Sequence, residues 1–242
     1  MEHIFRQRIP VDPRYTDTAG LLKLSALLYL VQEAAGTHAD LLGADWDRLQ
    51  EKGLFWAILR HRIQVERLPK AGDTITLETW PLPTSRVAYP RATAAYDDAG
   101  NLLFRTTAIW ILMDRESRTM VLPGKSGVEV LGALRGDELP APGSIVPAQL
   151  PNSCCRTVTD GDLDRNNHMN NARYLDWVQE LLPEGSVPRE MNLAYLAEAI
   201  KGQTLTLHWE QDPAGFFRLE ACREKPGLPG SQERVFAARI QF

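Results

Sequence analysis

The chain repeats its own sequence pattern at two separate places, and this repetition limits the folds that it can adopt. The triplet Val-Gln-Glu at 31–33 returns at 178–180, a displacement of 147 residues. A second pair of segments, GDTITL at 72–77 and GQTLTL at 202–207, is displaced by 130 residues. Two matches in the same order indicate an internal duplication. We therefore predict two modules of the same architecture.

A helical pattern opens each copy, and strand patterns follow it. Apolar residues recur at helical spacing over 24–42 and again over 174–181. Thr18 in the first copy and Asn170 or Asn171 in the second are candidate N-caps. Strand-like runs follow at 55–68, 74–80, 86–96 and 102–113, and in the second copy at 191–199, 204–210, 215–223 and 234–242. A helix followed by antiparallel strands, twice over, predicts an α+β fold.

The interval between the two copies is rich in glycine, proline and charged residues. We predict a first module at 1–135, a linker at 136–150 and a second module at 151–242, with a short helix at 128–134 before the linker. Because proline stiffens a linker, the segment is expected to act as a spacer that runs over the surface.

Composition narrows the classes of function. The formal net charge is −4, from 27 Lys+Arg against 31 Asp+Glu, and this argues against a dedicated nucleic-acid binder. Three cysteines make no disulfide framework, and no C-x-x-C pair offers a zinc site. The longest apolar stretch, 21–35, contains Lys23, Gln32 and Glu33 and is too short and too polar to span a bilayer. Since no secretory signal opens the sequence, we expect a cytoplasmic protein.

The densest polar cluster, DLDRNNHMNN at 162–171, carries the strongest candidates for chemistry. Asp164, Asn166 and His168 are two residues apart, and in an extended segment this spacing places the three side chains on one side. Free N–H groups at the start of the following helix would polarise a carbonyl group and stabilise an oxyanion. The alternative interpretation is a well-capped polar loop without chemistry.

The first copy differs from the second at this cluster. It keeps an aspartate, Asp17, but has Ala19 and Leu21 where the second copy has the amide and the imidazole. Because the complete polar set is found in the second copy alone, we expect one working site per chain. Glu198, at the end of an apolar strand pattern, is a further candidate, because a carboxylate near apolar surface tends towards a raised pKa suited to a general base. Its alternative is a solvated strand end.

Three segments resemble one known family. DLDRNNHMNNARY at 162–174 is similar to the signature of the acyl-acyl carrier protein thioesterases of plants and bacteria, and RYTDTAG at 14–20 and NLAYLAEA at 192–199 resemble other parts of that family. The resemblance covers essentially the whole chain. It implies a tandem hotdog fold, in which each module is a long helix wrapped by an antiparallel sheet, and an N-terminal module that binds the acyl chain. It also implies hydrolysis of fatty acyl-acyl carrier protein to the free fatty acid, without a metal or cofactor.

The resemblance places the family's catalytic set on Asp164, Asn166, His168 and Glu198. Many relatives have a cysteine where this chain has Ala199, so a cysteine nucleophile cannot act at that position. Two mechanisms remain open. Either Asp164 or Glu198 activates a water molecule, or Asp164 attacks the thioester and forms an anhydride. His168 and Asn166 would hold the carboxylate or the water and bind the thioester carbonyl.

Three alternative functions keep the fold. The first is a hydrolase of acyl-coenzyme A, the second is a dehydratase of 3-hydroxyacyl thioesters, and the third is a non-catalytic binder of acyl groups or of the carrier protein. The D-x-N-x-H-x-N-N run argues against the dehydratase. The expected partner is an acyl carrier protein bearing a fatty acyl thioester, with no nucleic acid and no membrane span. A homodimer is compatible with the sequence.

Overall fold

The computed structural model describes residues 3–212, 215–225, 227–228 and 230–242. The chain divides into two compact units, at 1–142 and 143–242. Within the residues that the structure describes, no helix combines the length and the apolar character that are needed to cross a membrane.

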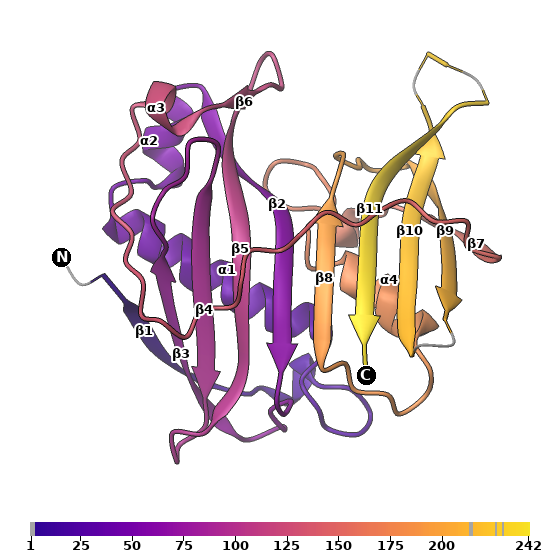
Figure 1. Ribbon diagram of the computed structural model, residues 1–242, viewed down its shortest axis with the longest axis horizontal. Coiled ribbons are helices and arrows are strands. Elements are labelled where there is room, and N and C mark those ends of the chain that lie inside the picture. The colour runs from indigo at the N-terminus through magenta and orange to yellow at the C-terminus, as the bar shows by residue number, and fades with distance from the viewer. Residues whose placement is uncertain (1–2, 213–214, 226, 229) are drawn as a thin grey trace. The chain divides into compact units, whose positions relative to one another are not determined.

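The first unit is an antiparallel sheet with a long helix along one face (Figure 1). The strand order is β1-β3-β4-β5-β2, and β6 pairs with β5. The elements in chain order are β1 (Phe5–Pro10), the 3-10 turn η1 (Pro13–Tyr15), α1 (Leu24–Leu41), α2 (Trp46–Glu51), β2 (Leu54–Val65), β3 (Thr74–Pro81), β4 (Tyr89–Tyr96), β5 (Leu102–Asp114), β6 (Met120–Val121) and α3 (Pro123–Ser126).

Helix α1 follows the predicted apolar periodicity. Leu24, Leu27, Leu28 and Val31 are all buried, as expected for one face of a helix that packs on a sheet. The helix ends before Gly43, which has a φ of 75°, a conformation that glycine adopts at little cost. The predicted N-cap was wrong, because the helix begins six residues after Thr18.

The second unit repeats the first. Its strand order is β7-β9-β10-β11-β8, which matches β1-β3-β4-β5-β2 strand for strand. Its elements are β7 (Asn152–Thr157), η2 (Asp160–Asp162), α4 (Tyr174–Leu181), β8 (Glu190–Tyr195), β9 (Thr204–Gln211), β10 (Phe216–Glu224) and β11 (Gln232–Gln241).

Helix α4 spans the residues 174–181 that the apolar periodicity predicted. With 8 residues against 18 in α1, it is shorter than the long helix that the family resemblance implied for each module. Pro183 follows the C-cap residue Leu182, and the residue before a proline is driven out of the helical region. The predicted N-caps were wrong, because the helix begins at Tyr174 with Arg173 as its N-cap residue, so neither Asn170 nor Asn171 caps it.

The displacements of 147 and 130 residues recur in the backbone pairing. An isolated bridge joins Thr16 to Leu22 in the first unit, and its counterpart joins Leu163 to Met169 in the second. A further pair of bridges joins Leu21 to Lys70 and His168 to Ile200, which combines both displacements in one contact. The predicted duplication is therefore confirmed as a structural repeat.

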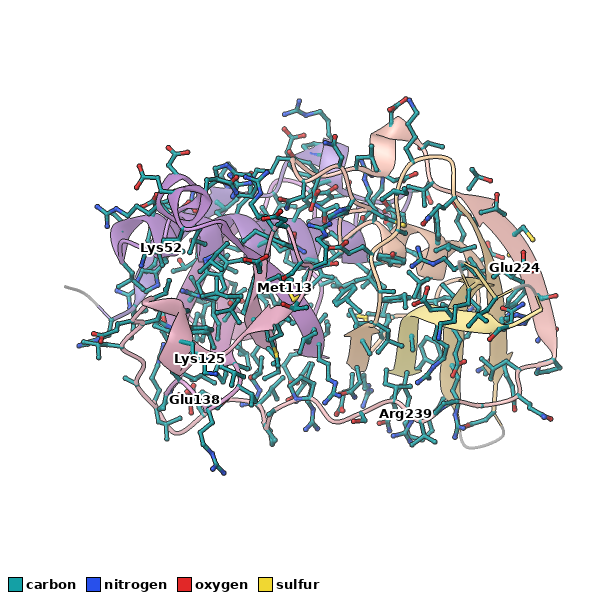
Figure 2. The ribbon with its side chains drawn as sticks, turned by 90° about the horizontal axis from the view of Figure 1, so that it is seen from above. Lys52, Met113, Lys125, Glu138, Glu224 and Arg239 are labelled. Atoms are coloured by element: carbon teal, nitrogen blue, oxygen red, sulfur yellow. The ribbon has the colours of Figure 1, made fainter. Side chains whose placement is uncertain are left out.

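The segment after α3 packs on the sheet face of the first unit opposite α1, where Figure 2 labels Glu138. The predicted helix at 128–134 is not formed, because these residues lie extended along the sheet. Arg135 pairs with the buried Glu78 at 2.6 Å, and Trp80 Nε1 donates to Glu138. Burial opposes ionisation of Glu78, but bonds from Arg135 and Arg6 outweigh it and lower the pKa.

The predicted linker is held by side chains at both of its ends. At the start, Thr107 Oγ1 donates to Leu139 O at 2.9 Å. Further along, Ala148 N donates to Glu220 Oε1 at 3.1 Å, and Glu220 is itself buried. The segment therefore packs against sheet strands near each end, as well as connecting the two repeats.

Candidate active site

The candidate site is built on the loop between η2 and α4. A capping box at Thr159 and Asp162 fixes the start of this loop. Asp164 N donates to His168 O at 2.8 Å, so residues 164–168 close on themselves as a turn. Asn167 has a φ of 61°, in the left-handed region that the tip of such a turn requires. The expected extended segment was therefore wrong in conformation.

The carboxylate of Asp164 organises this turn. Its Oδ1 accepts the N–H of Asn166 at 2.7 Å and the N–H of His168 at 3.2 Å. Its Oδ2 accepts a longer bond, at 3.4 Å, from Asn166 Nδ2. One Nδ2 hydrogen of Asn166 is used in that bond, and a primary amide carries two. The turn thus brings the predicted aspartate and asparagine together, and it leaves one amide hydrogen for another acceptor.

The imidazole of His168 meets the carboxylate of Glu198. The His168 Nε2 to Glu198 Oε2 distance is 3.5 Å, with 16% of the histidine side chain and 41% of the glutamate side chain exposed. The bridge between His168 and Ile200 produces this contact, because it holds the loop beside the segment that follows β8. Glu198 lies three residues beyond the end of β8 and is exposed, which fits the alternative of a solvated strand end better than that of a carboxylate against apolar surface.

The expected free N–H groups at the start of the helix were also wrong in part. Met169 N donates to Ala199 O at 2.8 Å, Asn170 N donates to Asp162 O, and Ala172 N donates to Asn170 Oδ1. These three amides are therefore engaged within the protein. They are not available to an oxyanion, whereas Asn166 Nδ2 keeps a hydrogen that can be donated to one.

Below the loop, aromatic rings fill the core of the second unit. Tyr174 at the start of α4 stacks on Phe236 with ring centroids 4.5 Å apart, and Tyr195 packs against the same ring at 5.4 Å. Burial raises the pKa of both tyrosine hydroxyls. Both are therefore neutral at pH 7, and the three rings form an aromatic core next to the start of α4.

One residue next to Glu198 was not predicted from the sequence. Arg223, on β10, donates from Nη1 to the main-chain oxygen of Glu198 at 2.7 Å. Nothing in the local pattern of β10 marks this arginine, since charged residues are common near strand ends. Alignment of the two repeats could have identified it, because the equivalent residue of the first unit is Asp97, whose charge is opposite.

Among the residues that the structure describes, no group of three or more His, Cys, Asp and Glu side chains is placed to hold a metal ion. The available groups are one imidazole, two carboxylates and one carboxamide. This set suits proton transfer and hydrogen bonding to a carbonyl group.

The chain is similar to known proteins in both sequence and structure. The family model for the acyl-ACP thioesterase N-terminal domain matches residues 2–122, and the model for the C-terminal domain matches 155–229. A palmitoyl-acyl carrier protein thioesterase of Gossypium hirsutum is 29% identical over 198 residues, which is 74% of this chain and 47% of that protein. A dodecanoyl-[acyl-carrier-protein] hydrolase of Cinnamomum camphora is 28% identical over 204 residues, 75% of this chain and 51% of that protein. The chain thus spans about half the length of these curated relatives.

Solved structures with the same architecture cover nearly all of the chain. An acyl-ACP thioesterase of Bacteroides thetaiotaomicron has a TM-score of 0.83 at 23% identity, over 99% of this chain and 98% of its own. The 12:0-ACP thioesterase of Umbellularia californica has a TM-score of 0.81 at 22% identity, over 100% of this chain and 97% of its own. These neighbours confirm the tandem hotdog fold. With two family models matched in order along its length, the chain belongs to the acyl-ACP thioesterase family.

Proposed function

We propose that the chain hydrolyses the thioester of a fatty acyl-acyl carrier protein, and that the products are the free fatty acid and the carrier-protein thiol. The observation that carries this proposal is the 3.5 Å contact between His168 and Glu198, beside the amide of Asn166. Family membership supports the same reaction class. A thioester is an activated acyl group, so a positioned base and a hydrogen-bond donor to the carbonyl are adequate machinery.

In the proposed mechanism, Glu198 takes a proton from a water molecule as the water oxygen forms a bond to the thioester carbon. The second Nδ2 hydrogen of Asn166 stabilises the negative charge that develops on the carbonyl oxygen. When the carbon–sulfur bond breaks, the electron pair stays on sulfur, and the proton held by Glu198 passes to the thiolate. His168 orients the Glu198 carboxylate from 3.5 Å. Water supplies the oxygen of the fatty acid, and no other reactant is required.

The repeat argues for Glu198 over Asp164 as the base. Asp17 occupies the position of Asp164 in the first unit, and its Oδ1 accepts the N–H groups of Ala19 and Leu21, each at 2.9 Å. The same carboxylate geometry is therefore present in a unit that has neither the asparagine nor the histidine. We infer that the aspartate closes the turn in both units, and that Asp164 is not the nucleophile.

The test compares substrates and matched variants. Wild-type protein and His168→Ala are assayed for release of free thiol from one long-chain acyl group carried on acyl carrier protein and on coenzyme A. His208→Ala serves as a control, because His208 lies on β9 of the same unit and outside the site. Turnover of acyl-acyl carrier protein that is lost in His168→Ala and retained in the control supports the proposal.

Two results would contradict it. Preferential turnover of the coenzyme A thioester would make the chain an acyl-CoA thioesterase. No turnover of either thioester, with tight binding of the acylated carrier protein, would make it a binding protein.

A further inference from the structure

Arg223 joins three separate segments of the second unit around Glu198. Its Nη1 donates to the main-chain oxygen of Glu198 and to Gln203 Oε1, each at 2.7 Å. Its Nε and Nη2 both contact Glu233 on β11 at 2.8 Å. Only 16% of the arginine side chain is exposed. The planar guanidinium matches several acceptors at once, which a lysine cannot do.

The segment that carries Glu198 also has a support that is common to both repeats. The N–H groups of Leu196 and Ala197 both donate to Val235 O, at 2.8 and 3.2 Å. In the first unit, the N–H groups of Glu66 and Arg67 likewise both donate to Leu103 O, at 2.9 and 3.0 Å. These paired main-chain bonds, the shared frame, are therefore independent of catalysis, because they are equally present in the unit without the site.

The bond from Arg223 to the main-chain oxygen of Glu198 is different, because a contact of another kind takes its place in the first unit. Leu77 pairs with Ala95 in the first unit as Leu207 pairs with Ala221 in the second, and this register aligns Asp97 with Arg223. Asp97 accepts the N–H of Asn101 within its own hairpin at 2.8 Å, and its Oδ2 pairs with the side chain of Arg67 at 3.2 Å, so it makes no bond to a main-chain oxygen of the neighbouring segment.

The same unit-specific pattern holds for the candidate catalytic groups. The positions of Asn166, His168 and Glu198 are taken by Ala19, Leu21 and Leu68 in the first unit. Arg223 therefore differs between the repeats together with the site residues, whereas the shared frame does not differ.

We propose that Arg223 is a positioning residue for the thioesterase reaction, which fixes the main chain at Glu198 so that its carboxylate stays within reach of His168. The inference rests on the proposed function. Glu233 balances the charge of Arg223, so the arginine acts mainly through geometry. Gln203 extends the effect, because its Oε1 also accepts the N–H of Ile200 at 3.1 Å, two residues after Glu198.

The first experiment measures kcat and KM for Arg223→Met with acyl-acyl carrier protein. A displacement of about 1 Å at a reacting group costs up to about 100-fold in rate, so we expect kcat to fall about 10- to 100-fold with KM within about twofold of wild type. Arg223→Lys should lose less, since its ammonium group can still donate one of these hydrogen bonds, although it cannot match several acceptors at once. Arg218→Met is the control: Arg218 lies on the same strand and pairs with Asp212 at 3.2 Å, and its kcat should be unchanged.

A double-mutant cycle separates positioning from general damage. Glu198→Gln and Glu198→Gln/Arg223→Met are compared with the single variant at Arg223. If Arg223 acts through Glu198, its replacement lowers kcat by less than about twofold once the carboxylate is gone. Should Arg223→Met not fold, Arg223→Lys carries the same cycle, and thermal unfolding is recorded for each protein.

Two results would overturn the inference on its own. One is a wild-type kcat in Arg223→Met, and the other is an equal fold-loss from Arg223→Met with and without the Glu198 carboxylate. Absence of wild-type turnover of acyl-acyl carrier protein would instead overturn the proposed function, and this inference with it.

Discussion

Replacing Asp164 by asparagine distinguishes a carboxylate that holds a loop from one that attacks the substrate. The amide keeps an oxygen that can accept the N–H groups of Asn166 and His168, so the turn should survive. It cannot act as a nucleophile that forms an anhydride. If Asp164 only closes the turn, we expect kcat to fall by less than about tenfold. A lost nucleophile would cost on the order of 10⁴-fold or more.

The stability of the same loop gives a second magnitude. Asp164→Ala removes two bonds from main-chain N–H groups in a half-buried turn, at about 1 kcal/mol each, so we expect a loss of about 2 kcal/mol in the free energy of unfolding. Asp17→Ala removes two corresponding bonds in the first unit and should cost a similar amount. The asparagine variants at both positions should retain most of this stability.

The assay follows thiol release from acyl-acyl carrier protein, with urea unfolding for the four variants. Intact mass confirms that the asparagine at 164 has not deamidated to aspartate. A loss of more than about 1,000-fold in kcat for Asp164→Asn, at unchanged stability, would refute the loop assignment. Heavy oxygen from labelled water found in the Asp164 carboxylate after a single turnover would refute it independently.

Three further predictions concern the fold. Burial lowers the pKa of His61 from 6.5 to about 3, so between these pH values only the unfolded chain binds a proton at this residue. The free energy of unfolding should therefore fall as the pH falls below 6.5, by up to about 1.4 kcal/mol per pH unit. The urea midpoint of His61→Met should depend less steeply on pH than that of the wild type. A Cβ at Gly132 would lie 2.0 Å from Leu82 O, so Gly132→Ala should lose about 1–3 kcal/mol in thermal unfolding, while Gly143→Ala, with open space around it, should not. Asn167→Gly should keep wild-type stability, whereas Asn167→Val should lose about 1–2 kcal/mol on calorimetry because of its positive φ.

The duplication could be predicted from sequence because equivalent positions of the two units keep the same or similar residues where the backbone has the same conformation. The strands at the sheet edges could not. Strands β1 and β7, FRQRIP and NSCCRT, are mostly exposed and carry no alternation of apolar and polar residues. Their place in the sheet is decided by pairing with β3 and β9, which is a tertiary contact. The missed strands are therefore the ones with no buried face to mark them.

The helix predicted at 128–134 fails for a related reason. Its apolar residues have helical spacing, but the segment is bound along a sheet by individual contacts, such as Thr84 Oγ1 to Val130 O at 3.1 Å. Close approach of Gly132 to the main chain at Leu82 also requires an extended path with no side chain at that point. Tertiary contacts override local periodicity here, as they commonly do for a short segment.

An internal repeat helps to assign roles to the residues of the site. Spacing alone placed Asp164, Asn166 and His168 on one side of an extended segment, but the carboxylate instead folds the chain back, and the imidazole meets Glu198 from a distant part of the sequence. No local pattern predicts a contact across 30 residues. The first unit supplies the control that one copy could not, because Asp17 performs the same folding task without the other polar groups. What the two units share is assigned to folding, and what only the second unit has is assigned to chemistry.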